Sequence, residues 1–152
     1  MKTIFTIAFV CIIGSLSAQS GSARMVNWSF ASKKINDNTY ELRIKAAVTG
    51  KYHIYAQDVG VEGPVPTTFS FSANPMVSME GKVKEVGKLV QKHEAVWDGK
   101  VNYFEKEVEF VQVVKLKKNI KTTVAGSVEF MVCDDKECLP PSEVPFKIAL
   151  GS

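Results

Sequence analysis

The stretch that decides the fold runs from Val124 to Pro141 and reads VAGSVEFMVCDDKECLPP. Every second residue from Val124 to Val132 is apolar or glycine, and this period of two predicts a β-strand with one face toward a core. The residues between them form the outward set, and Cys133 continues their parity. The pattern therefore predicts that the strand delivers Cys133 to the accessible side of its sheet as it ends.

Short alternating segments recur along the rest of the chain. The clearest spans residues 40–48, where the even-numbered positions are apolar and Glu41, Arg43 and Lys45 lie between them. Similar segments lie at residues 26–30, 52–56, 67–71, 103–117 and 144–150, with a weaker one at 82–90. Eight or nine short strands separated by turn signals, with no convincing helix, predict an all-β fold, an antiparallel β-sandwich.

Two segments interrupt this pattern. Residues 91–99 break the alternation and are expected to form a loop. Within 103–117 the parity shifts over Val111 to Val114, which predicts a bulge or a strand that changes sheets there.

Composition limits the class of protein. The 152 residues are 45% hydrophobic and 23% charged, which indicates one soluble globular domain. The formal charge is +3 and the basic residues are scattered, so nucleic acid is not expected as a partner. The two histidines show no metal-ligand spacing with the cysteines, and we expect neither a metal site nor a cofactor.

The first 18 residues have the features of a secretory signal peptide. Lys2 precedes a short apolar run, and Ser17-Ala18 forms a small-residue site after which cleavage is expected. Cys11 lies inside the apolar run and would be discarded. Residues 19–24 are then expected to be a flexible leader, and residues 25–150 the folded domain. Export places Cys133 and Cys138 in an oxidising compartment.

The two remaining cysteines flank the charged turn Asp134 to Glu137. A tight turn can bring two cysteines to the separation that a disulfide requires. Closing so short a loop stabilises a fold by only about 2 kcal/mol in the chain-entropy estimate, which suits reversible chemistry better than a staple. The acids, however, disfavour a nearby thiolate. The residues alone leave a working dithiol and a structural disulfide both open.

Three motifs resemble a known family. The Cys133-x4-Cys138 pair followed by Leu139 and Pro140-Pro141 resembles the amino-terminal periplasmic domain of the DsbD thiol:disulfide interchange reductase. Residues 93–100, HEAVWDGK, are similar to the cap loop of that family, and residues 52–55, YHIY, to its aromatic strand near the site. The resemblance covers about residues 25–150 and implies an immunoglobulin-like β-sandwich.

The resemblance also implies a role for each site residue. Cys138 would form a mixed disulfide with a partner, and Cys133 would resolve it. Trp97 would be the cap that packs over the sulfurs and moves away on docking. Glu94 or Asp98 would supply a carboxylate for proton handling, since Ala95 and Val96 stand where family members carry acids. Tyr52, Tyr55, Pro140 and Pro141 would support the site. Better-known members have one more residue between the cysteines.

The leading hypothesis is therefore an exported, monomeric thiol–disulfide oxidoreductase domain of the periplasm. It would take electrons from a thioredoxin-like donor, with a membrane electron-transfer protein as a further partner, and pass them to thioredoxin-fold clients. If the chain is complete, its electrons come from separate partners; otherwise it is a fragment of a longer reductase. The alternatives are a non-redox binding module shaped by a short disulfide, or a structural subunit of an envelope assembly.

Overall fold

The computed structural model describes residues 21–151, so the expected signal peptide, Cys11 and residues 19–20 lie outside the described residues. The elements in chain order are η1 (Gly21–Met25), β1 (Val26–Lys34), β2 (Thr39–Val48), β3 (His53–Tyr55), β4 (Thr68–Phe71), β5 (Val77–Glu94), η2 (Ala95–Trp97), β6 (Gly99–Leu116), β7 (Thr122–Phe130), β8 (Val132–Cys133) and β9 (Ser142–Leu150). Among the described residues, no helix has the length and apolar character needed to cross a membrane.

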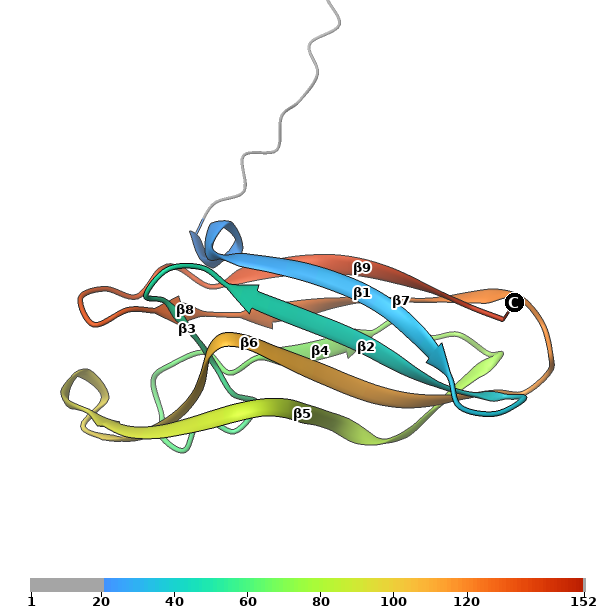
Figure 1. Ribbon diagram of the computed structural model, residues 1–152, viewed down its shortest axis with the longest axis horizontal. Coiled ribbons are helices and arrows are strands. Elements are labelled where there is room, and N and C mark those ends of the chain that lie inside the picture. The colour runs from blue at the N-terminus through green and yellow to red at the C-terminus, as the bar shows by residue number, and fades with distance from the viewer. Residues whose placement is uncertain (1–20, 152) are drawn as a thin grey trace, which may run out of the picture.

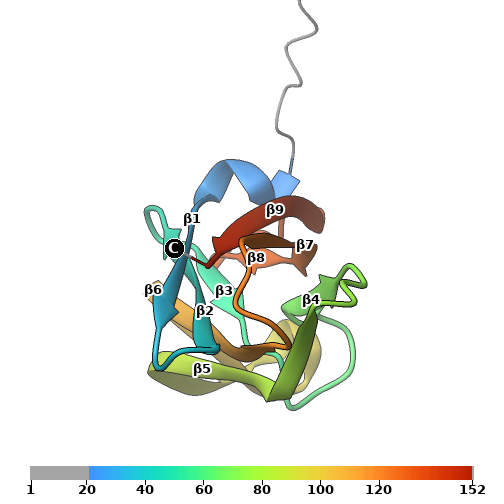
Figure 2. The same cartoon turned by 90° about the vertical axis from the view of Figure 1, so that its right-hand side faces the viewer.

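The strands form two antiparallel sheets that pack face to face (Figures 1 and 2). The larger sheet has the order β1-β2-β6-β3-β8, with β5 along the other side of β6, and the smaller sheet has the order β4-β7-β9. β6 is the centre of the larger sheet, because β3 pairs with its first part and β2 with the rest. The predicted antiparallel β-sandwich is confirmed.

The core lies between the sheets. The even-numbered residues of β2, from Tyr40 to Val48, are all buried, as their alternation predicts. Trp28 of β1 packs edge-on against Phe130 of β7, with ring centroids 5.1 Å apart, and also contacts Phe110 of β6. These rings join the two layers through buried apolar surface, the main stabilising contribution to such a fold.

The parity shift in β6 lies earlier than the sequence predicts. Val101 and Tyr103 are buried on one face, whereas Phe104, Val108 and the following even-numbered positions are buried on the other. The shift falls where β6 exchanges β3 for β2 as its neighbour, next to Lys106, whose φ of 62° is left-handed. The burial parity does not change over Val111 to Val114, so the predicted parity shift there was wrong. The predicted bulge is present in the pairing with β5, where the register shifts between the pairs Glu80–Val113 and Lys84–Val111.

The expected loop at residues 91–99 was also largely wrong. β5 continues to Glu94 and pairs with β6, and only the turn around η2 lies outside the ladder. Gln91 to His93 are exposed, so backbone pairing holds this part of the strand and burial does not. A strand without a buried face gives no alternation for the sequence to reveal.

The chain crosses between sheets at Met131. β7 belongs to the smaller sheet, and β8, which starts at the next residue, pairs with β3 of the larger sheet. This crossing carries Cys133 to one end of the sandwich, where the turn after β8 and the turn at η2 both project (Figure 1). The fold therefore brings residues near 97 and near 133 to the same end.

Candidate redox site

Cys133 and Cys138 are joined by a disulfide across a narrow hairpin. Their Cα atoms are 4.0 Å apart. The flanking backbone bonds run from Asp134 N to Glu137 O at 2.9 Å and from Leu139 N to Val132 O at 3.0 Å. The two cysteines are thus a non-hydrogen-bonded antiparallel pair, the position where facing residues approach most closely. The four residues between the cysteines are enough to form the turn of this hairpin.

Asp134 organises the turn between the cysteines. Its Oδ1 accepts hydrogen bonds from the backbone N–H groups of Lys136 and Glu137, each at 2.8 Å. These two bonds hold the pKa of the Asp134 carboxyl below its usual value. Tyr52 supports the far side of the turn, because its hydroxyl donates to Glu137 Oε1 at 3.2 Å.

The two sulfur-bearing residues differ in exposure. Cys138 is exposed, whereas Cys133 is only 1% exposed. The prediction that Cys133 reaches the accessible side of the sheet was therefore wrong. Its parity is as expected, but that face of the sheet is covered by a second hydrophobic cluster that includes Tyr55, Val59 and Met131. The loop after β3 and the η2 turn supply the cover.

Trp97 packs against this second cluster from the η2 turn. A Cβ atom at Gly63, in the loop after β3, would collide with the indole ring, so the ring lies directly on the Gly63 backbone. The indole N–H donates to the Tyr55 hydroxyl at 3.0 Å. Trp97, Val96, Cys133 and Cys138 line one hollow of about 240 Å³ beside the disulfide.

Three polar side chains meet beneath this turn. The Tyr55 hydroxyl donates to Glu94 Oε2 at 3.5 Å, and Glu94 Oε1 lies 3.7 Å from His53 Nε2. Burial raises the pKa of Tyr55 to about 12, lowers the pKa of His53 to about 4 and raises the pKa of Glu94. His53 is consequently neutral at pH 7, and the contact with Glu94 is not an ion pair.

The other predicted site residues are placed differently. Asp98 is exposed, adopts a left-handed φ of 47° after η2, and does not line the hollow at the disulfide. Pro140 and Pro141 are exposed, and the Pro140 carbonyl accepts two hydrogen bonds from Ser22. Among residues 21–151, no group of three or more His, Cys, Asp or Glu side chains is arranged to hold a metal ion.

Two buried residues at the site were not singled out from the sequence. His53 lies two positions from Tyr55 on β3, so the strand period already places both on one face. Ser22 is fully buried and hydrogen-bonded to the base of the hairpin. The flexible leader expected at residues 19–24 was therefore wrong for Gly21 to Arg24, which form η1. A single serine in a short polar segment carries no periodic signal.

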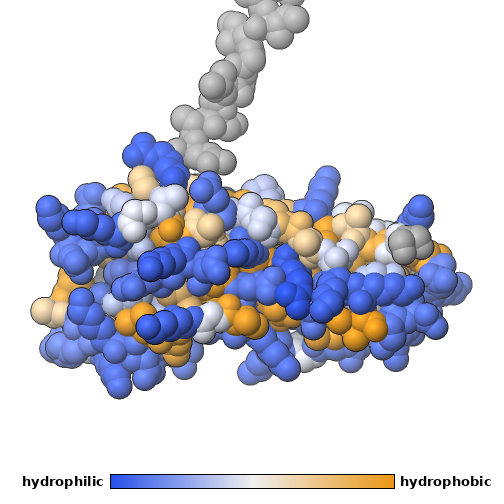
Figure 3. All heavy atoms as spheres, in the orientation of Figure 1, coloured by the Kyte–Doolittle hydropathy of each residue, from blue (hydrophilic) through white to orange (hydrophobic). Residues whose placement is uncertain are grey.

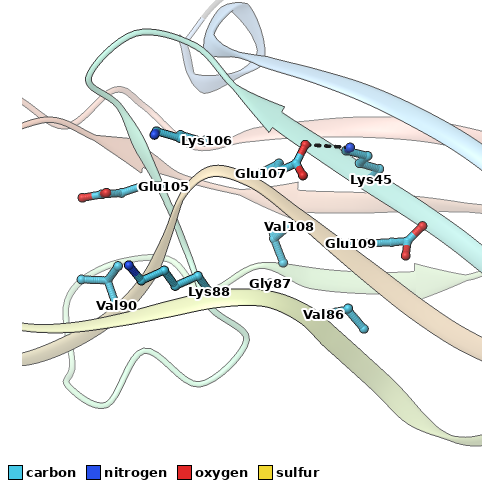
Figure 4. A pocket seen from close by; sticks show the side chains of 10 residues that line it. All are labelled: Lys45, Val86, Gly87, Lys88, Val90, Glu105, Lys106, Glu107, Val108 and Glu109. Carbon is cyan, nitrogen blue, oxygen red and sulfur yellow. Dashed lines mark ion pairs between the residues drawn. The ribbon is translucent and has the colours of Figure 1, made fainter.

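A larger hollow of about 490 Å³ lies elsewhere, between β2, β5 and β6 (Figure 4). It opens where β6 bends at Lys106 and where the β5 register shifts near Gly87. Lys45 and Glu107 at its rim are paired at 2.7 Å. Its lining includes neither cysteine, so we place the candidate chemistry at the smaller hollow, which holds the disulfide.

The fold and the site together define a β-sandwich domain with a disulfide-bonded cysteine pair at one end, of which one cysteine is buried and the other exposed. The profile of the family described as the N-terminal domain of thiol:disulfide interchange protein DsbD matches residues 23–149. The chain belongs to this family, and the resemblance inferred from the cysteine pair and its Pro-Pro is confirmed. A sequence search against curated proteins found no match.

Solved structures of this kind share the fold. The N-terminal periplasmic domain of ScsB from Proteus mirabilis superposes with a TM-score of 0.56 at 11% identity, over 80% of this chain and 44% of that one. The reduced DsbD N-terminal domain of Neisseria meningitidis gives 0.55 at 13% identity, over 85% and 88%. The complex of the Neisseria meningitidis DsbD and PilB N-terminal domains gives 0.51 at 11% identity, over 91% and 88%. These likenesses confirm the immunoglobulin-like fold.

Proposed function

We propose that this domain carries electrons between proteins of the periplasm through the Cys133 and Cys138 dithiol. It accepts them from a thioredoxin-like donor and passes them to thioredoxin-fold clients. The observation that carries the proposal is the asymmetry of the pair, because Cys138 is exposed on one strand of the hairpin whereas Cys133, facing it on the other strand, is buried. Exchange needs one sulfur that a partner can reach and a second that closes the disulfide behind it.

The electron transfer runs in two displacements. The Cys138 thiolate attacks a client disulfide, forms a mixed disulfide and releases one client sulfur as a thiolate. The Cys133 thiolate then attacks Cys138, forms the intradomain disulfide and releases the second client thiolate. The pair gives up two electrons, and its two protons end on the client thiols. The oxidised form described here is the product of this half of the cycle.

Glu94 is the carboxylate that we assign to proton handling. Its side chain lines the hollow beside the disulfide, where it can exchange a proton with a reacting sulfur, and burial raises the pKa of its carboxyl above the usual value. Tyr55 holds it from one side and the neutral His53 lies 3.7 Å away on the other. Asp98, the other predicted candidate, is exposed and does not line the hollow.

Cys138 is exposed to a docking partner, and the turn after β8 projects at one end of the sandwich (Figure 1). The solved complex between the DsbD and PilB N-terminal domains of Neisseria meningitidis shows that a domain of this fold forms a protein complex. The proposal is that this chain, as a monomer, docks thioredoxin-fold proteins in the same general way. A membrane electron-transfer protein is the proposed source of electrons for the donor.

Single-cysteine variants test this assignment. Cys133→Ser leaves the exposed Cys138, which is expected to form a mixed disulfide with a thioredoxin whose resolving cysteine has been replaced. Cys138→Ser leaves the buried Cys133, which is expected to react at least about tenfold more slowly with iodoacetamide and to trap little partner, because the thiol reacts only when the cap opens. Mass spectrometry of the trapped species identifies the sulfur. Equal trapping by both variants would refute the assigned order.

The reduction potential separates exchange from a structural role. Equilibration of the wild-type domain with glutathione buffers, read by alkylation and mass spectrometry, is expected to give a potential within the range of thioredoxin-fold couples. A potential below about −300 mV, with no exchange with thioredoxin, would instead identify a structural disulfide that shapes a binding loop.

A further inference from the structure

Ser22 of η1 lies at the base of the disulfide hairpin and is fully buried. Its Oγ accepts a hydrogen bond from Val132 N at 3.0 Å. The same hydroxyl has two carbonyl acceptors within reach, Pro140 O at 2.9 Å and Leu139 O at 3.3 Å. One hydroxyl thus contacts both chains of the hairpin, immediately next to the cysteines.

The position of these bonds gives the hydroxyl its role. Val132 and Leu139 are the pair next to Cys133 and Cys138, and an antiparallel pair of this kind exchanges two backbone bonds. One of them is present, from Leu139 N to Val132 O at 3.0 Å. In place of the other, the Val132 N–H bonds to the Ser22 hydroxyl, which lies within reach of the Leu139 carbonyl. The serine side chain therefore links the two strands of the hairpin at the position where the second backbone hydrogen bond is missing.

η1 is itself fixed in place. Ser22 N donates to Pro140 O at 3.0 Å, and Ala23 N donates to Ser142 Oγ at 3.0 Å. Gly21 has a φ of 64°, and a Cβ atom there would approach Pro140 O to 2.6 Å. Because η1 leads directly into β1, these contacts tie the hairpin to the body of the sandwich.

We propose that Ser22 is a positioning residue for the redox pair. It holds the stem of the hairpin in register after the disulfide is reduced, so that the two sulfurs stay close enough to re-form their bond. This inference rests on the proposed exchange function. In the oxidised domain the covalent bond holds the cysteines together, whereas in the dithiol the hydrogen bonds of the hairpin must do so, and the Ser22 bridge is one of those that link the two strands at the pair next to the cysteines.

The consequence is a difference between the two oxidation states. Without the Ser22 hydrogen bonds the two cysteines can move apart in the dithiol, whereas in the disulfide the covalent bond still holds them together. The effective concentration of one sulfur at the other therefore falls in the dithiol. Reduction by glutathione, in which two electrons and two protons pass to the cysteines and two glutathione molecules become one glutathione disulfide, then becomes more favourable. We expect a shift of about tenfold in the equilibrium constant, equivalent to about 30 mV for a two-electron couple.

The sharpest comparison is Ser22→Val against Ser22→Thr in the folded mature domain. The two side chains have the same shape, so any steric effect of the added atoms is shared and only the hydroxyl differs. The equilibrium with glutathione, read by alkylation, is expected to shift toward the dithiol by about tenfold in Ser22→Val relative to Ser22→Thr. Ser32→Ala is the control, because Ser32 is exposed and bonds to Ala149 O on β9, within the sandwich.

Ser22→Ala adds no atoms and serves if the larger side chains prevent folding. A variant that is less stable to urea by the same amount in both oxidation states, with an unchanged equilibrium constant, would show a purely structural serine and overturn the proposal. The glutathione readout needs no protein partner. If the wild-type domain failed to exchange with thioredoxin, the proposed function would be refuted. The effect of Ser22 on the equilibrium with glutathione would still be tested by the variants.

Discussion

His53 combines burial with an imidazole that has no hydrogen-bond partner for Nε2 among the described residues. Burial lowers its pKa to about 4, although the charges of Asp135 and Asp134 oppose the shift and Lys92 assists it. Between pH 6.5 and 4 the unfolded chain therefore binds a proton that the folded chain excludes. Stability contributed by the neutral His53 is present at neutral pH and is lost as the pH falls through this window.

We expect the wild-type domain to lose about 2 to 3 kcal/mol between pH 7 and pH 4.5 relative to His53→Gln, which cannot be protonated in this range. The nearby Glu94 acts in the opposite direction, because its raised pKa favours folding at low pH, and comparison with His53→Gln removes that common contribution. Urea unfolding at the two pH values measures the difference. The exposed His93 provides the control, and an equal response of His93→Gln and His53→Gln would contradict the assignment.

At the scale of single residues, the local motifs predict which side chains gather at the candidate site better than they predict how those side chains are buried. The cysteine pair, Trp97 and Glu94 were selected from local motifs, and the structure places all of them at one hollow. The burial of Cys133 was not predictable, because the cover comes from a loop near residue 60 and a turn near residue 97. Ser22 acts through contacts more than 100 residues away, and no local pattern encodes such contacts.

Among the elements, the η2 turn carries Trp97, the predicted cap of the disulfide. Trp97 rests on Gly63 and is held by the Tyr55 hydroxyl. Trp97→Ala is expected to leave the fold largely intact and to speed reduction of the disulfide by 2-mercaptoethanol by about tenfold, because a ring that restricts access to the sulfurs is removed. Stopped-flow alkylation assays would measure the rate. Trp97→Phe retains a ring, and its reduction rate should stay within about threefold of the wild-type rate. If reduction were no faster in Trp97→Ala than in the wild type, the cap assignment would be wrong.

Gly63 offers an independent test of the same element from the opposite side. Its φ of 123° is strained for other residues, and a methyl group there would enter the space of the Trp97 ring. Gly63→Ala is expected to destabilise the domain by about 1 to 3 kcal/mol and to speed reduction in the same way as Trp97→Ala. Gly50→Ala is the matched control, since Gly50 also has a positive φ but a Cβ atom there meets open space. Equal reduction rates in the two glycine variants would show that displacing Trp97 does not open the site.

Elements with one buried face were predictable, and elements held by pairing alone were not. β2 alternates cleanly because one face meets the core and the other carries ion pairs such as Arg43 with Glu109. β5 is long, but its residues are mostly exposed, and its last part gave no strand signal. The bend in β6 at Lys106 depends on which neighbour pairs on each side, which is a property of the sheet and not of the segment.

Over the whole molecule, β5 is an edge of the larger sheet in the part of the chain that the structure describes. Met79, Val86 and Leu89 are exposed along it, and hydrophobic surface is visible among hydrophilic side chains on this face (Figure 3). Lysines at positions 82, 84, 88 and 92 and two register shifts interrupt the edge. These features oppose pairing with a second copy of the sheet.

The edge lysines should therefore keep the domain monomeric. We expect Lys84→Val combined with Lys88→Val to produce dimers or larger species at concentrations where the wild type is monomeric, as measured by light scattering after size exclusion. Lys115→Val on the central strand β6 removes an exposed charge of the same sign away from the edge and is the control. Association of the control to the same extent would assign the effect to lost net charge.

Charge is also distributed unevenly along the long axis of the sandwich. The turn between β6 and β7 carries Lys117, Lys118 and Lys121 at the end opposite the disulfide hairpin, which carries Asp134, Asp135 and Glu137 (Figure 1). Lys136 offsets one of these three acids, so the hairpin turn is net acidic, whereas the chain as a whole has a formal charge of +3. Such an arrangement orients an approaching charged partner.

The acidic end should disfavour attack by a thiolate that carries a second negative charge, relative to a thiolate balanced by an ammonium group. Raising the ionic strength from about 0.02 to 0.2 M shortens the screening length to less than 10 Å. We expect this change to speed reduction of the disulfide by 3-mercaptopropionate, whose attacking thiolate carries two negative charges, by about two- to threefold, because the repulsion is screened. Reduction by cysteamine, whose attacking thiolate is a zwitterion without net charge, should change much less. Asp135→Asn with Glu137→Gln should weaken the response to 3-mercaptopropionate, and Glu137→Gln keeps an acceptor for Tyr52. An equal salt effect for both thiols would show that the acids of the hairpin do not select the charge of the attacking partner.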